Sequence, residues 1–152
     1  RIAIALPPDL PPVNGDPGAV RQILDNLLVN AAKYGRGSEI AVHATFDEAT
    51  VSLSVEDGGP GLPDHEREQI FELFYRAGSN QREASGTGIG LFVVAQLARS
   101  MGGTTVAEGR EPNGLRVVVT LPVAQPADMG LEGAEDVAAP PEPFRPSAAG
   151  SV

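Results

Sequence analysis

The sequence predicts an α+β fold, a two-layer α/β sandwich in which a mixed sheet of about five strands is covered by about three helices. Helices are indicated by apolar residues that recur every three or four positions, and strands by alternating or β-branched segments. Turn residues separate neighbouring strand segments, which favours hairpins. The expected order along the chain is β-α-β-β-α-α-β-β.

The chain is expected to begin with a strand and a long helix. The strand covers residues 1–6 and ends at a proline-rich segment. Asp16 and Pro17 are typical of a helix N-cap followed by proline in the first turn. Apolar residues recur at helical spacing over 20–31, and Gly35 marks the end of this helix.

A hairpin and a short helix are expected next. Residues 39–46 and 50–56 alternate or carry β-branched side chains, and the three residues between them form a turn. Residues 57–63 contain too many glycines and prolines for a helix or a strand, so they predict a loop. The spacing of apolar residues over 65–74 predicts a short amphipathic helix.

The remaining elements are a polar segment, an apolar helix and a closing hairpin. The segment 75–88 is rich in glycine, serine and polar residues, so we expect it to be mobile. An apolar helix is expected from about Ile89 to Met101, where two glycines follow. Residues 104–109 and 115–122 are expected to form the last two strands.

Composition predicts one domain over residues 1–123 and a disordered tail rich in proline, alanine and acidic residues over 124–152. The net charge of -9 argues against a nucleic-acid surface, because no basic field is present to bind phosphates. No apolar run approaches the roughly 20 residues that span a bilayer. The chain has no cysteine, which excludes disulfides and thiolate metal sites. A cytoplasmic location is expected.

Three polar residues share one face of the first predicted helix. Asn26, Asn30 and Lys33 stand at i, i+4 and i+7, beside the apolar stripe. Polar residues in this position are often only surface residues. However, asparagine is a poor helix former, and a neutral oxygen ligand beside a cation suits Mg²⁺ that carries phosphates.

Two glycine-rich segments add further candidates. Asp57 ends a strand and is followed by glycines, so it is either part of an ordinary turn or a carboxylate that accepts a hydrogen bond from an exocyclic amine. Gly86, Gly88 and Gly90 precede the second long helix. Their G-x-G-x-G spacing and the polar loop before them do not match a dinucleotide fingerprint, and no Lys-Ser/Thr follows as in a Walker A loop. A glycine hinge at a helix N-terminus remains, which is a potential anion site.

Taken together, "DNLLVNAAKY", "DGGPG", "IFELFYR" and "GTGIGL" resemble the N, G1, F and G2 boxes of the catalytic ATP-binding domain of two-component sensor histidine kinases. The resemblance runs from Arg1 to about Pro122. It implies a Bergerat-type ATP-binding fold with a mobile ATP lid over 62–85. It also implies ATP and Mg²⁺ as cofactors and a histidine-containing dimerisation and phosphoacceptor domain, in cis or in trans, as partner. That domain would in turn serve a response regulator, and the parent kinase can be membrane-anchored.

The resemblance also implies roles for single residues. Asn30 would coordinate Mg²⁺, Lys33 would contact phosphate, and Asn26 would line the same side. Tyr34 would pack beside the adenine, and Asp57 would bind its amine. The other residues expected to contact the nucleotide are Gly59, Gly61 and Leu62 around the base, Arg76 at the γ-phosphate, and Gly86, Thr87, Gly88, Gly90 and Leu91 around the phosphates. Thr120 is expected to reach the adenine edge through water.

The residue at position 26 distinguishes ATP hydrolysis from phosphoryl transfer to a histidine. Related ATPases resemble one another in having a glutamate four residues before the magnesium ligand, where it activates water. An amide cannot take that proton, so Asn26 implies very slow ATP hydrolysis and transfer to a partner's histidine. Neither His43 nor His65 has the surroundings of a phosphoacceptor. The alternative is a non-catalytic nucleotide-binding module of the same superfamily, either a degenerate kinase or an anti-sigma-like regulator.

Overall fold

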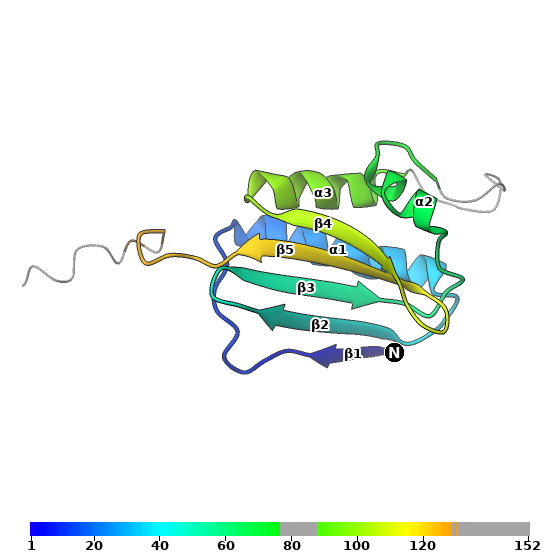
Figure 1. Cartoon of the computed structure of the whole chain (residues 1–152), viewed down its shortest axis with the longest axis horizontal. Coiled ribbons are helices and arrows are strands. Elements are labelled where there is room, and N and C mark those ends of the chain that lie inside the picture. Colours follow the sequence, from blue (N-terminus) through cyan, green and yellow to red (C-terminus); the bar gives the residue numbers. More distant parts are fainter. Residues whose placement is uncertain (77–87, 129, 131–152) are drawn as a thin grey trace, which may run out of the picture.

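A five-stranded mixed sheet forms one layer of the molecule (Figure 1). The computed structural model describes residues 1–76, 88–128 and 130. The strands are β1 (Ile2–Ala5), β2 (Ile40–Phe46), β3 (Thr50–Glu56), β4 (Thr104–Gly109) and β5 (Leu115–Pro122), in the spatial order β1-β2-β3-β5-β4. Only β1 and β2 are parallel, because α1 lies between them in the chain. The α+β prediction is confirmed.

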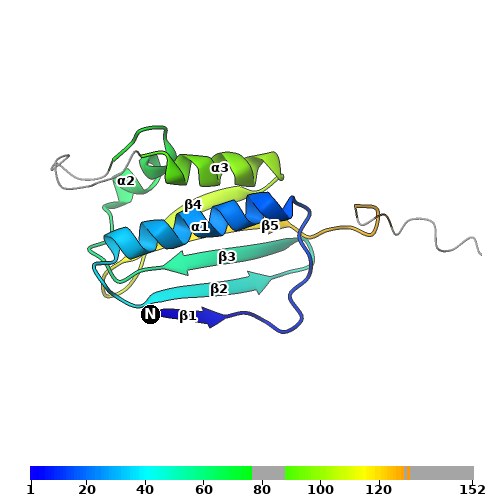
Figure 2. The same ribbon diagram turned by 180° about the vertical axis from the view of Figure 1, so that it is seen from behind.

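The helices cover one face of this sheet (Figure 2). They are α1 (Pro17–Tyr34), α2 (Asp64–Arg67), the 3₁₀ turn η1 (Gln69–Phe71) and α3 (Gly90–Ser100). The α1 helix begins as predicted, because the side chain of Asp16 accepts a hydrogen bond from the Ala19 amide at 2.7 Å.

The short helix predicted over 65–74 is wrong in its length. The structure has one turn of α-helix and one 3₁₀ turn there, and the backbone is extended at Glu72. Within α2 and η1, Ile70 is the one buried residue. A short helix is marginal without packing on a core, and this segment buries too little surface to continue.

The core lies between the sheet and the two long helices. Ile23 and Leu27 of α1 and Val94 of α3 are at most 1% exposed, and Val119 of β5 is fully buried. Along β5 the residues alternate between buried and half-buried, so Leu115, Val117, Val119 and Leu121 face the helices. This alternation decides which β5 side chains can reach the site described below.

The opposite face of the sheet carries polar side chains. Ser52 on β3 and Thr120 on β5 are cross-strand partners whose hydroxyls hydrogen-bond at 2.9 Å. Glu56, Glu108 and Arg116 form ion pairs on the same face. These groups remain in contact with water on a face that the described helices leave uncovered, as the two views show (Figures 1 and 2).

Backbone hydrogen bonds hold the chain slightly beyond the predicted domain boundary at residue 123. The Val123 amide donates to the Ala49 carbonyl at 2.8 Å, and the Ala124 amide donates to the Pro12 carbonyl at 2.9 Å. The predicted tail lies mostly outside the described residues, as does the segment 77–87 of the predicted lid. Among the described helices none is long and apolar enough to cross a bilayer.

Candidate nucleotide-binding site

A cavity of about 1010 Å³ lies beside the C-terminal half of α1. Its walls come from α1, the loop after β3, the segment from α2 to Arg76, and the beginning of α3. Sequence-predicted site residues that line it are Asn26, Asn30, Lys33, Tyr34, Asp57, Gly61, Leu62, Arg76, Gly88, Gly90 and Leu91. Residues that are far apart in the sequence are therefore brought together, in a volume typical of small-molecule sites.

The α1 wall presents amide and amine groups to the cavity. Asn26 donates from its side-chain amide to the Gln22 carbonyl one turn earlier, at 3.0 Å. Its Oδ1 atom lies 3.3 Å from the position that a Cβ of Gly90 would occupy, so it faces the first turn of α3. The Lys33 ammonium lies 4.8 Å from the centre of the Tyr34 ring, a cation–π contact.

Asp57 is the buried carboxylate of the site, with 4% of its surface exposed. Its Oδ1 accepts a hydrogen bond from the Gly59 amide at 2.8 Å. Its own amide donates to the Leu115 carbonyl at 3.0 Å, which fixes the end of β3 against β5. Burial raises the pKa of Asp57 above its usual value, and backbone hydrogen bonds to the carboxylate from Gly59 and Leu115 and the charge of Arg110 partly oppose the increase.

Glycines allow the backbone to come close at this end of the sheet. A Cβ on Gly59 would collide with the Tyr34 carbonyl, so a side chain there would separate the loop from α1. Gly61 has a φ of 71°, and its Cβ would lie 2.8 Å from the Gly114 carbonyl oxygen. Gly59 does not itself line the cavity, although it supports the loop that does.

The segment before residue 77 and the start of α3 meet at the far wall. The Phe74 amide donates to the Gly88 carbonyl at 3.1 Å. Arg76 lines the cavity, and its Nε atom is buried without a hydrogen-bond partner among the described residues. A buried donor of this kind is costly unless a ligand meets it, which marks Arg76 as a candidate anion contact.

Sequence reasoning missed several lining residues. Ile70, Leu115 and Val93 provide apolar wall, and Tyr75 and Glu66 lie together near α2. Burial and a hydrogen bond to Glu66 raise the pKa of the Tyr75 hydroxyl. The sequence did contain a signal for Ile70 and Leu115, because both belong to apolar patterns that predict burial. Both are buried in the structure.

The prediction for Thr120 is wrong. Strand alternation places Thr120 on the polar face of the sheet, where its hydroxyl contacts Ser52 at 2.9 Å. Leu115 is the β5 residue that lines the cavity. Gly86 and Thr87, both predicted to surround the phosphates, lie outside the described residues.

The two histidines do not line the cavity. His43 is half-buried on β2, opposite Ser54 of β3. The side chain of His65 is 78% exposed, and its Nε2 lies 3.9 Å from a Glu66 oxygen.

Comparison with known proteins supports these observations. Residues 15–125 match the family described as histidine kinase-, DNA gyrase B- and HSP90-like ATPase. The sensor histidine kinase CpxA of Escherichia coli K12 is 36% identical over 123 residues, which cover 80% of this chain and 27% of CpxA. The sensor-type histidine kinase PrrB of Mycobacterium tuberculosis H37Rv is 37% identical over 108 residues, covering 71% of this chain and 24% of PrrB.

Solved structures show the same fold. Full-length ShkA in complex with AMPPNP superimposes with a TM-score of 0.71 at 32% identity, over 82% of this chain and 26% of that one. The mycobacterial sensor histidine kinase MprB gives 0.69 at 28% identity, over 81% of each chain. This chain thus spans about a quarter of the length of the curated relatives that it matches. It belongs to the histidine kinase-, DNA gyrase B- and HSP90-like ATPase family, as the ATP-binding catalytic domain found in sensor histidine kinases.

Proposed function

We propose that this domain binds Mg-ATP and presents its γ-phosphoryl group to a histidine on a dimerisation and phosphoacceptor domain, in cis or in trans. The phosphorylated histidine then serves a response regulator. One observation carries the proposal: Asn30, Lys33 and Arg76 line the same cavity as the buried Asp57. Cationic and amide groups that can bind a triphosphate thus share a cavity with a carboxylate that can bind the adenine base.

Asp57 recognises the base in this proposal. One carboxylate oxygen is held by the Gly59 amide at 2.8 Å, and Asp57 lines the cavity. A carboxylate is an acceptor only, so it pairs with the exocyclic amine of adenine and not with the carbonyl oxygen that guanine has there. The apolar side chains of Leu62 and Leu115 provide contact for the flat ring.

Lys33, Arg76 and the start of α3 hold the phosphates. The first backbone amides of α3 lack helical partners, and the helix dipole favours negative charge at this end. No cluster of three acidic, histidine or cysteine side chains that could hold a metal occurs in the described part of the chain. Mg²⁺ fits all the same, because it prefers phosphate oxygens and water with few protein ligands, and Asn30 offers one amide oxygen. Bound there, it would neutralise phosphate charge.

In this proposal, Asn26 makes water a poor acceptor of the γ-phosphoryl group. The Asn26 side chain, which faces the first turn of α3, is an amide and does not take a proton. A partner imidazole supplies its own nucleophilic nitrogen, which forms the bond to the γ-phosphorus while ADP leaves with the bridging oxygen. The domain therefore contributes positioning and charge stabilisation only.

The test is phosphoryl transfer from γ-labelled ATP to a purified helical-hairpin protein that carries the acceptor histidine. We expect label on the acceptor, loss of label when that histidine is replaced, and little release of phosphate by the domain alone. Binding without transfer at saturating ATP would favour the alternative, a non-catalytic nucleotide-binding module. Rapid phosphate release without an acceptor would contradict the role given to Asn26.

A further inference from the structure

Three charged residues form a cluster at the C-terminal end of β3, on the sheet face that the helices leave uncovered. Glu56 is the last residue of β3, and its side chain is only 16% exposed. Arg110 approaches one of its oxygens at 3.2 Å and Arg116 the other at 3.4 Å, through Nε in each case. Since both oxygens have a cation, Glu56 is a fixed anchor for two arginines.

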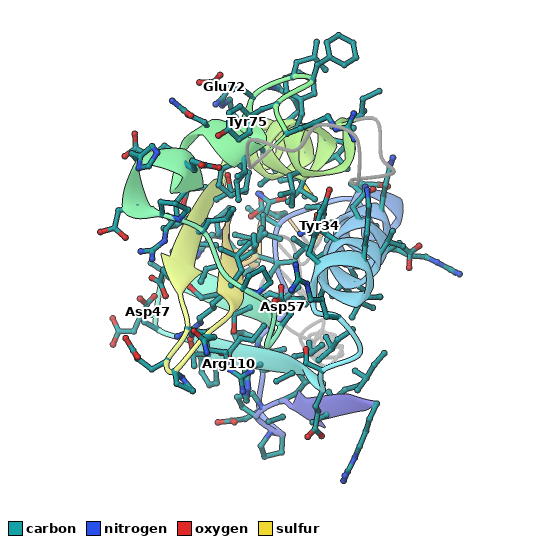
Figure 3. All side chains as sticks on the ribbon, turned by 90° about the vertical axis from the view of Figure 1, so that its right-hand side faces the viewer. Tyr34, Asp47, Asp57, Glu72, Tyr75 and Arg110 are labelled. Carbon is teal, nitrogen blue, oxygen red and sulfur yellow. The ribbon has the colours of Figure 1, made fainter. Side chains whose placement is uncertain are left out.

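Arg110 lies against both neighbours of Asp57. It pairs with Glu56 on one side, and its Nη1 lies 3.7 Å from the position that a Cβ of Gly58 would occupy on the other. Figure 3 shows Asp57 between Tyr34 and Arg110. The Arg110 guanidinium therefore lies on the side of Asp57 that is away from the nucleotide cavity. Asp57 lines that cavity, and Arg110 does not.

The backbone couples the same two residues. The Arg110 amide donates to the Gly114 carbonyl at 3.1 Å, which closes the turn between β4 and β5. The Leu115 carbonyl, one residue later, accepts the Asp57 amide at 3.0 Å. A Cβ on Gly114 would collide with the Asp57 carbonyl oxygen, so the turn and the end of β3 are in direct contact.

The charge of Arg110 acts on Asp57. Burial raises the pKa of Asp57, and the positive charge of Arg110 opposes this increase. The other charged groups around the site are Glu56 on β3 and Lys33, Arg36, Glu66 and Arg76 on the cavity wall. Arg110 approaches from beneath the end of β3, whereas Lys33, Arg36 and Glu66 line the side that a nucleotide would occupy.

We propose that Arg110 is a positioning residue for base recognition, which orients and charge-stabilises the Asp57 carboxylate without touching the nucleotide. Glu56 holds the guanidinium in place for this task. Arg116 also pairs with Glu56 but, unlike Arg110, has no described contact with Gly58, the residue that follows Asp57. The inference depends on the proposed role of Asp57 in nucleotide binding.

Binding of Mg-ATP to Arg110→Gln, Arg110→Lys and Arg116→Gln tests the proposal by calorimetry across a pH series. We expect Arg110→Gln to weaken binding about two- to fivefold, the range of an exposed ion interaction. On acidification, Arg110→Gln should lose binding at a higher pH than the wild type does, because a larger fraction of its Asp57 is protonated at any given pH. Arg110→Lys should restore most of the affinity, and Arg116→Gln should match the wild type. Carboxyl ¹³C NMR of nucleotide-free protein should show a higher Asp57 pKa in Arg110→Gln alone.

A double-mutant cycle separates this role from general support of the fold. In an Asp57→Asn background, Arg110→Gln should cause no further loss of affinity, and urea unfolding reports the folded state of each variant. An equal loss in both backgrounds, an equal loss in Arg116→Gln, or an unchanged Asp57 pKa would overturn the inference. Failure of the wild-type chain to bind Mg-ATP would instead contradict the proposed function.

Discussion

At the scale of single residues, the spacing along α1 was informative because helical geometry fixes where side chains lie. Asn26, Asn30 and Lys33 were predicted on one face, and all three line the cavity. The prediction for Thr120 failed although its correction was present in the sequence. Apolar residues occupy alternate positions from Leu115, so Thr120 has to face the other side.

Asp57 is a residue at which binding and stability conflict. Its pKa is raised in the folded protein, so folded chains bind more protons than unfolded chains between pH 3.8 and the higher value, and stability falls as pH rises through that window. Asp57→Asn should therefore unfold at a higher temperature than the wild type at pH 7. It should also bind ATP about 10- to 100-fold more weakly, as expected for a lost hydrogen bond to a charged group.

Calorimetry of unfolding and of ATP binding checks both effects of Asp57→Asn. The stability difference should shrink as the pH approaches 3.8, since the wild-type carboxyl is then protonated too. A variant that is less stable than the wild type at pH 7 would show that the charged form of Asp57 supports the fold.

Asn30→Ala tests the proposed magnesium ligand. Alanine is the better helix former, so we expect the helical circular dichroism signal and the melting temperature to be retained. Binding of ATP in the presence of Mg²⁺ should fall to the level measured with EDTA. Asp25→Ala is the matched control, because Asp25 is exposed on the same helix and, within the described part of the chain, pairs only with Arg21. Unfolding of Asn30→Ala would instead identify a structural residue.

At the scale of elements, strands and long helices were predictable because each combines a repeating pattern with clear end signals. Residues 65–74 were not, since a helical pattern shows which residues would share a face but not whether a core lies beneath it. Only Ile70 is buried there in α2 and η1. Tertiary packing therefore decides the length of this element.

The turn between β2 and β3 depends on one carboxylate. Oδ1 of Asp47 accepts hydrogen bonds from the Ala49 and Thr50 amides at 2.8 and 2.7 Å, and these bonds lower its pKa. Asp47→Ala should lower the free energy of unfolding at pH 7 and leave ATP affinity unchanged, because the turn lies at the opposite end of β3 from Asp57 (Figure 1) and does not line the cavity.

Urea unfolding at several pH values measures the contribution of Asp47. The stabilisation is complete above pH 3.8 and is lost as pH falls through the lowered pKa, so the two proteins should converge on acidification. Glu48→Ala controls for removal of a charge from the same turn. An equal effect of Glu48→Ala would show that the hydrogen bonds of Asp47 are not the cause.

At the scale of the whole molecule, composition predicted a domain over residues 1–123, and this boundary stays a prediction. Composition could not show the backbone bonds of Val123 and Ala124, because main-chain pairing leaves no trace in residue type. The spatial order of the five strands could not be predicted from composition either, although hairpins between neighbouring strands were expected. The core could be predicted because it follows from alternation and helical spacing.

Two truncations test how far the folded unit extends. A chain ending at Asp128 should keep the ATP affinity and the stability of the full chain. A chain ending at Pro122 lacks the amides of Val123 and Ala124, which donate to Ala49 and Pro12. We expect it to lose about 2 kcal/mol of unfolding free energy, at about 1 kcal/mol for each hydrogen bond. Denaturant unfolding measures the difference, and equal stability of the two truncations would place the boundary at Pro122.

The hydrogen bond between the Phe74 amide and the Gly88 carbonyl has a consequence for how such domains can vary. It joins the chain just before and just after residues 77–87, so the cavity walls on either side are tied to each other at their base. Closing a longer loop across fixed ends costs only about 0.6 kcal/mol for each doubling of its length. Insertions and deletions between Arg76 and Gly86 should therefore cost the fold little, because a change of length there leaves the two cavity walls joined at these anchors.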